Sequence, residues 1–168
     1  LITGQFENDI FNSEEWNTEI QNYWINNNPE YLVNRFLSLE SSLNLNRVFI
    51  LTTRSTASAS ELIINCLDPY IDVIQIGTTT YGKYQASVTL YDSENFSNQN
   101  INPSHNYAIQ PLVLKTLNVL GITDYFNGIN PEYDFEEKVY NMWIIGNLNE
   151  PMLNFAMGLI NSRAEINI

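Results

Sequence analysis

The sequence predicts an α/β fold built on a strand–helix–strand unit. Residues 47–53 form a β-branched and apolar run, which is typical of a buried strand. Residues 54–67 begin with small polar side chains and become apolar, which indicates a turn leading into a helix. A second apolar run, residues 71–76, stops at Gly77. A strand, a helix and a strand within about 30 residues predict a parallel pair of strands and the α/β class.

The elements around this unit follow from the same periodicities. Residues 13–28 begin with Ser13 as an N-cap candidate and carry aromatic side chains at helical spacing, so we expect an amphipathic helix whose aromatic stripe faces the core. Further strands are expected at 86–91 and, as one or two strands, within 107–119.

Two polar segments, 92–106 and 121–141, are predicted to be surface loops because they are rich in Asn and Ser or in acidic residues. A last helix is expected from 152 to about 162, with Pro151 in its first turn. No internal repeat and no domain boundary is found, so the 168 residues are expected to form one domain.

Composition excludes several function classes. The chain has 19 acidic and 7 basic residues and a formal net charge of −12, and its bases are scattered singly. Nucleic-acid binding is therefore not expected, because neutralising phosphates needs clustered Lys and Arg. The single cysteine, Cys66, excludes an internal disulfide framework and a Cys-rich metal site, and its apolar surroundings predict a buried side chain. No apolar run reaches the roughly 20 residues of a membrane helix.

Ser58 is the candidate nucleophile, since a serine at a strand-to-helix corner lies beside free backbone N–H groups that can bind an oxyanion. The N–H of Ala59 suits that role, although small polar residues at a helix start are also typical of simple caps. His105 lies in a polar loop, so a Ser-His-Asp triad is not expected. A lysine can act as the base when burial among apolar groups lowers its pKa, since only the neutral amine accepts a proton. Lys83 is the candidate because it follows the second strand and parallel strands bring both loops to one sheet end. Taken alone, Lys83 also fits a surface lysine.

Two motifs at matched spacing extend this interpretation. Residues 56–61 read Thr-Ala-Ser-Ala-Ser-Glu, residues 76–83 read Ile-Gly-Thr-Thr-Thr-Tyr-Gly-Lys, and Lys83 lies 25 residues after Ser58. Both motifs and their spacing resemble the C-terminal-processing peptidases, also called tail-specific proteases, over roughly residues 47–135 and the last helix. The resemblance implies a crotonase-like βαβ core with a mixed sheet flanked by helices.

For the chemistry, the resemblance implies Ser58 as nucleophile, Lys83 as general base and the Ala59 N–H as an oxyanion donor. It also implies a protein or peptide substrate, no metal and no cofactor. The family often has a glutamine four residues after the lysine, where this chain has Ser87, whereas Gln85 comes two residues earlier. Ser87 and Gln85 are therefore the candidates for orienting Lys83.

The family's glycine-rich turn for a second oxyanion donor, its PDZ domain and its N-terminal region are not recognised in the sequence. Residues 1–168 are thus expected to be the C-terminal portion of a serine peptidase catalytic domain, an incomplete domain that is weak or inactive alone. The resemblance implies a location in the periplasm or cell envelope, or secretion. Glu61 is expected only to favour the helix dipole from the first turn.

Two other classes stay open. One is a non-catalytic module that binds a peptide or a glycan through the acidic surface and the ten tyrosines. The other is an acyl-CoA enzyme, which would show two backbone oxyanion donors without a Ser/Lys pair.

Overall fold

The computed structural model describes residues 4–138, 140 and 143–165. The elements in chain order are β1 (Ile10–Trp16), α1 (Thr18–Asn27), the 3-10 helix η1 (Pro29–Leu32), β2 (Val33–Arg35), β3 (Arg47–Thr52), α2 (Ala59–Leu67), β4 (Asp72–Gly77), β5 (Gln85–Ser87), β6 (Leu90–Tyr91), β7 (Ala108–Ile109), β8 (Leu112–Leu117), β9 (Tyr133–Asp134) and α3 (Pro151–Glu165).

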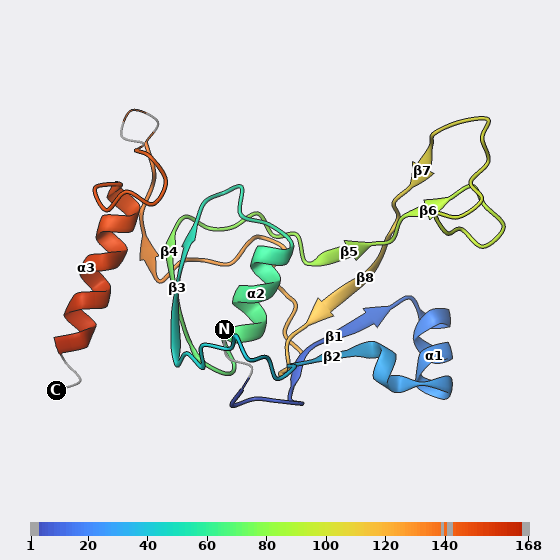
Figure 1. Cartoon of the computed structure of the whole chain (residues 1–168), viewed down its shortest axis with the longest axis horizontal. Coiled ribbons are helices and arrows are strands. Elements are labelled where there is room, and N and C mark those ends of the chain that lie inside the picture. The colour runs from blue at the N-terminus through green and yellow to red at the C-terminus, as the bar shows by residue number, and fades with distance from the viewer. Residues whose placement is uncertain (1–3, 139, 141–142, 166–168) are drawn as a thin grey trace.

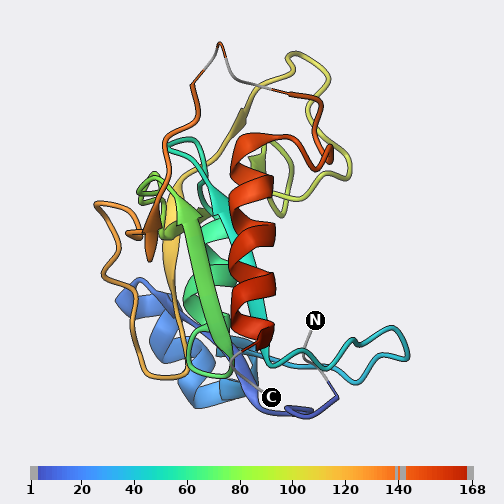
Figure 2. The same ribbon diagram turned by 90° about the vertical axis from the view of Figure 1, so that its left-hand side faces the viewer.

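The centre of the molecule has three layers, with the parallel sheet β3-β4-β9 between α2 and α3 (Figures 1 and 2). Successive side chains of a strand point to opposite faces of the sheet, so β4 packs against both helices. Ile74 and Ile76 are fully buried against Met152 of α3, whereas Val73 packs into the cluster that includes Leu67 of α2. Burial on both faces explains why β4 reads as a nearly continuous apolar run.

A second sheet, in the order β2-β1-β8-β5, is antiparallel and lies beside α2 (Figure 1). Beyond it, the chain continues from β5 into β6 and returns through β7 into β8. The small β6-β7 pair therefore projects away from the body of the molecule (Figure 1). This arm keeps residues 92–106 at the periphery, in agreement with the predicted surface loop.

The predicted strand–helix–strand unit is confirmed. β3 and β4 pair in parallel over their whole length, from Arg47 opposite Asp72 to Thr52 opposite Gly77. α2 ends at Leu67, where the sequence placed its end. Two strands within 107–119 and the last helix are also present, and Cys66 is fully buried as expected.

The predicted helix at 13–28 is wrong in its first turn and in its orientation. Ser13 and Trp16 belong to β1, where they pair with β8, because tertiary pairing overrides the local helical spacing. The N-cap is Asn17, whose side chain accepts the N–H groups of Glu19 and Ile20. No residue of α1 is buried, so its aromatic side chains do not form part of the core.

Three smaller differences concern short strands. The strand predicted at 86–91 is divided into β5 and β6, since the chain leaves one sheet there and enters another. β9 lies within the predicted loop 121–141, where it pairs for two residues with the end of β4. β1 and β2 were not predicted as strands. No helix within the described residues is long and apolar enough to cross a membrane.

Candidate active site

Ser58 lies on a strained corner between β3 and α2. It is the N-cap of α2 and has φ 57° and ψ −115°, a backbone conformation that favours glycine. A strained strand-to-helix turn is also how the nucleophile elbow of other hydrolases presents its serine. The Ser58 residue is exposed, so a substrate can reach it.

Ala59 is the first residue of α2, directly after Ser58. Its N–H is one of the first four of the helix, which have no intrahelical acceptor. The positive end of the helix dipole adds to the field at this point. A negatively charged oxygen formed next to Ser58 would therefore be stabilised here.

Lys83 follows β4 at the same end of the parallel sheet. Lys83 belongs to the loop of residues 78–84 between β4 and β5, which we call the lysine loop. The N–H of Tyr81 donates to the carbonyl oxygen of Thr56 at 2.8 Å, which joins the lysine loop to the loop that precedes Ser58. Lys83 is exposed, so the burial expected of a basic lysine is not found here. Within the described part of the chain its amine has no ion-pair partner. The amine is therefore not committed to a carboxylate.

Glu61 connects the two loops through a buried carboxylate. It is 0% exposed, and its Oε2 accepts the N–H of Ser58 at 2.9 Å and the N–H of Lys83 at 2.8 Å. Its Oε1 accepts the N–H of Gly82 and the hydroxyl of Thr80. One side chain thus fixes the backbone of both candidate catalytic residues.

Sequence reasoning assigned Glu61 only to the helix dipole and missed this role. An acid three residues after an N-cap serine is the signal of a capping box, which accounts for the bond to the Ser58 N–H. The three hydrogen bonds to the lysine loop join residues about 20 positions apart, so no local sequence pattern predicts them.

The loop of residues 125–130 packs against the lysine loop and is hydrogen-bonded to it. Thr80 accepts the N–H of Ile129 through its hydroxyl, and its own N–H donates to the Ile129 carbonyl. Gly82 and Gly128 both have positive φ, and a Cβ on Gly128 would lie 2.1 Å from the Thr80 carbonyl oxygen. Glycine is therefore required where these two loops touch.

Ser87 and Gln85, the candidates for orienting Lys83, both lie on β5 and are exposed. Their role is a prediction that these contacts leave untested. Thr56, the first residue of the first motif, accepts the Thr53 N–H through its hydroxyl at 2.9 Å. The threonine therefore keeps a structural hydroxyl at that position.

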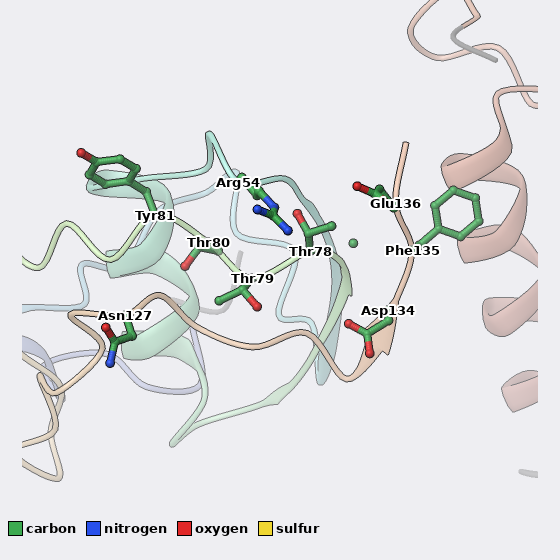
Figure 3. Close-up of a pocket in the computed structure, with 10 residues that line it drawn as sticks. Arg54, Thr78, Thr79, Thr80, Tyr81, Asn127, Asp134, Phe135 and Glu136 are labelled. Atoms are coloured by element: carbon green, nitrogen blue, oxygen red, sulfur yellow. The ribbon is translucent and has the colours of Figure 1, made fainter. Parts of the chain in front are cut away.

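A cavity of about 650 Å³ opens beside the two loops (Figure 3). Its lining residues are Arg54, Gly77, Thr78, Thr79, Thr80, Tyr81, Asn127, Asp134, Phe135 and Glu136. Arg54 comes from the turn after β3, and its guanidinium points toward Thr78 (Figure 3). The cavity is therefore a polar space next to the lysine loop, with one cation and two carboxyl groups on its walls.

His105 lies in the loop between β6 and β7, away from this site. Its Nε2 is 3.1 Å from Oδ2 of Asp92, and its Nδ1 accepts the N–H of Tyr107. The structure thus does not bring the histidine to Ser58. Among the described residues, no group of three or more His, Cys, Asp or Glu could hold a metal ion.

Neither a protein-family model nor a curated protein matches the sequence. Among solved structures, the chain is similar to a protein from Bacteroides fragilis that is assigned to the S41 proteases, with a TM-score of 0.74 and 25% identity. That match covers 96% of this chain and 39% of the Bacteroides protein, so the chain spans well under half of its length.

Two further structures are more distant. A lipoprotein from Streptococcus agalactiae matches with a TM-score of 0.56 and 14% identity, over 94% of this chain and 46% of that one. A photosystem II D1 C-terminal processing protease matches with a TM-score of 0.45 and 18% identity, over 63% of this chain and 25% of that one. No conclusion is drawn from this match because its TM-score is below 0.5.

The fold and the corner at Ser58 define a mixed α/β chain that presents an exposed, strained serine at a helix N-terminus. At the level of the fold, this chain is similar to the S41 proteases, in agreement with the resemblance of its two motifs.

Proposed function

We propose that this chain carries the catalytic Ser/Lys dyad of a serine endopeptidase of the C-terminal-processing type. The observation that supports it most directly is the strained, exposed Ser58 at the start of α2, with the backbone of Lys83 held by the same buried carboxylate. The similarity to a protein assigned to the S41 proteases supports peptide-bond hydrolysis as the reaction class.

In the proposed reaction, the Ser58 hydroxyl oxygen attacks the carbonyl carbon of the scissile peptide while the neutral Lys83 amine takes the hydroxyl proton. The carbonyl oxygen becomes an oxyanion that accepts the Ala59 N–H. The protonated amine then donates to the leaving nitrogen, and an acyl-enzyme remains. Water repeats the sequence with Lys83 as the base, which releases the carboxylic acid and restores Ser58.

A second oxyanion donor is not identified among the described residues near Ser58. Because one such donor is worth about 10²–10³-fold in turnover, we propose that the 168-residue chain alone is weakly active or inactive. We further propose that a polypeptide containing this chain acts at or near the C-termini of proteins, in the cell envelope or outside the cell, as the motif resemblance implies.

Labelling with a fluorophosphonate probe tests the dyad. We expect Ser58 to be labelled in a longer polypeptide that contains this chain, and about 10²–10³-fold more slowly in the 168-residue chain. Ser58→Ala and Lys83→Ala should abolish labelling and the hydrolysis of a quenched fluorescent peptide. The matched controls are Ser60→Ala, at an exposed serine two residues after Ser58, and Lys138→Ala, at an exposed lysine. Both variants should retain labelling and peptide hydrolysis.

Labelling that persists in Ser58→Ala, or at full rate in Lys83→Ala, would contradict the assignment of the dyad. Robust labelling of the isolated 168-residue chain would instead contradict the proposal that it lacks an essential donor.

A further inference from the structure

Aromatic side chains gather on the surface around α1, outside the candidate active site. α1 lies at the far end of the second sheet from α3, at the edge of the molecule (Figure 1). A depression of about 610 Å³ opens there. It is lined by Glu14, Trp16, Glu19, Ile20, Tyr23, Trp24 and Tyr31, and we call it the α1 depression.

The aromatic rings of the α1 depression pack against one another but remain open to solvent. The ring centroids of Trp24 and Tyr31 are 4.4 Å apart, and those of Tyr23 and Trp24 are 4.9 Å apart with planes at 76°. Tyr23 is 57% and Tyr31 63% exposed. No residue of α1 is buried, so these rings do not stabilise a core and leave a wide aromatic surface available to a ligand.

The charges around the α1 depression all have one sign. Glu14 and Glu19 line it, and the first 31 residues of the sequence contain six acidic residues and no Lys, Arg or His. The basic residues nearest in the fold are occupied, since Lys115 pairs with Glu15 and Arg35 with Glu30, each at 3.1 Å. Within the described residues, Glu14 and Glu19 therefore have no ion-pair partner.

The lining of the α1 depression contains no positively charged hydrogen-bond donor. The indole N–H of Trp16 donates to Glu14 at 3.0 Å, and the other donors of the lining are the neutral indole N–H of Trp24 and the phenol groups of Tyr23 and Tyr31. A neutral sugar could stack on the rings and form hydrogen bonds, but it would leave the negative charges of Glu14 and Glu19 without a countercharge. A ligand that brings its own donors, a positive charge and an apolar stem matches both the rings and the carboxylates.

We propose that the α1 depression binds an arginine or lysine side chain in a basic segment of a partner polypeptide. The aliphatic stem of that side chain lies on Trp24 and Tyr31, and the charged head lies between the ring faces and the Glu19 carboxylate. The geometry, charge and exposure of the depression carry this proposal, which does not depend on proteolysis by Ser58.

Titration calorimetry on the 168-residue chain tests it, with an acetylated and amidated peptide of alternating glycine and arginine as the probe. We expect saturable binding that quenches tryptophan fluorescence and weakens as salt is raised. The same peptide with citrulline in place of arginine keeps the shape without the charge and should bind at least about tenfold more weakly.

Variants locate the binding. Trp24→Leu should weaken binding about 5- to 20-fold, and Glu19→Gln about 2- to 5-fold. Tyr31→Leu is a second aromatic variant for the case in which Trp24→Leu does not fold. Glu40→Gln removes one exposed acid elsewhere on the surface and should leave binding unchanged.

The proposal is overturned if the arginine peptide shows no saturable binding, or if the citrulline peptide binds as well. Equal weakening by Glu40→Gln and Glu19→Gln would also overturn it, since binding would then follow net charge alone. A concentration-dependent dimer that Trp24→Leu abolishes would assign the depression to a second copy of the chain and not to a basic segment.

Discussion

Replacing the carboxylate of Glu61 by an amide tests whether one buried side chain holds the two candidate catalytic loops together. Each oxygen of Glu61 accepts two donors, the N–H groups of Ser58 and Lys83 at Oε2 and the donors of Thr80 and Gly82 at Oε1. In Glu61→Gln, one oxygen is replaced by an NH₂ group, which cannot accept. Two donors in buried or half-buried bonds then lose their acceptor, at about 1–3 kcal/mol each.

The free energy of unfolding should therefore fall by about 2–6 kcal/mol in Glu61→Gln, with a drop in Tm of about 5–20 °C for a chain of this size. Urea unfolding measures the loss. Amide hydrogen exchange should accelerate in the native state either at Ser58 and Lys83 or at Gly82, according to which oxygen of Glu61 the NH₂ group replaces. Glu61→Ala removes both acceptors and should cost still more.

Glu40→Gln is the matched control for this experiment, because Glu40 is exposed and its loss should change stability by less than about 0.5 kcal/mol. A Glu61→Gln variant as stable as Glu40→Gln, with unchanged exchange at Ser58, Gly82 and Lys83, would refute the reasoning. The carboxylate would then be a dispensable cap of α2 and not the link between the loops.

Three further predictions concern other parts of the molecule. Gly128→Ala should destabilise the chain by at least about 2 kcal/mol, as measured by urea unfolding, because the added methyl group meets a backbone carbonyl at a residue with φ +88°. Burial raises the pKa of the Cys66 thiol to about 12, so iodoacetamide should alkylate it at pH 8 only after unfolding. Hydrogen bonds from Asn102 and then His105 lower the pKa of Asp92, so the loop they close should be stable above about pH 4 and loosen as the pH falls through that lowered pKa, which NMR shifts of the Asn102 amide would follow.

Each of these has its own control. Gly121 also has a positive φ, of +77°, but no atom lies within 4 Å of an added Cβ. Gly121→Ala should thus lose only the backbone strain of about 1–2 kcal/mol, and an equal loss at both glycines would contradict the argument from close approach. Rapid alkylation of native Cys66 would contradict its burial. In Asp92→Asn the acid transition of the loop should disappear, and its persistence would assign the transition to another group.

The sequence alone predicted the central strand–helix–strand unit and the positions of the two candidate catalytic residues on it. The apolar runs of β3 and β4 are long and lie on either side of a helix start, so local periodicity and connection length leave little choice other than a parallel pair. The positions of Ser58 at the helix corner and of Lys83 on the loop after β4 follow from that pairing. Their motif and spacing could also be recognised, whereas their action as a catalytic pair stays a prediction.

The tertiary structure decided what depends on pairing between distant segments. Ser13–Trp16 has the spacing of a helix but lies in β1 because β8, about 100 residues later, offers backbone partners. Glu61 became the link between two loops because β3 and β4 end side by side, which no local pattern encodes. The aromatic side chains of α1 stay on the surface because the short η1, which packs Tyr31 against Trp24, does not bury them. Amphipathic spacing by itself cannot tell a core from a binding surface.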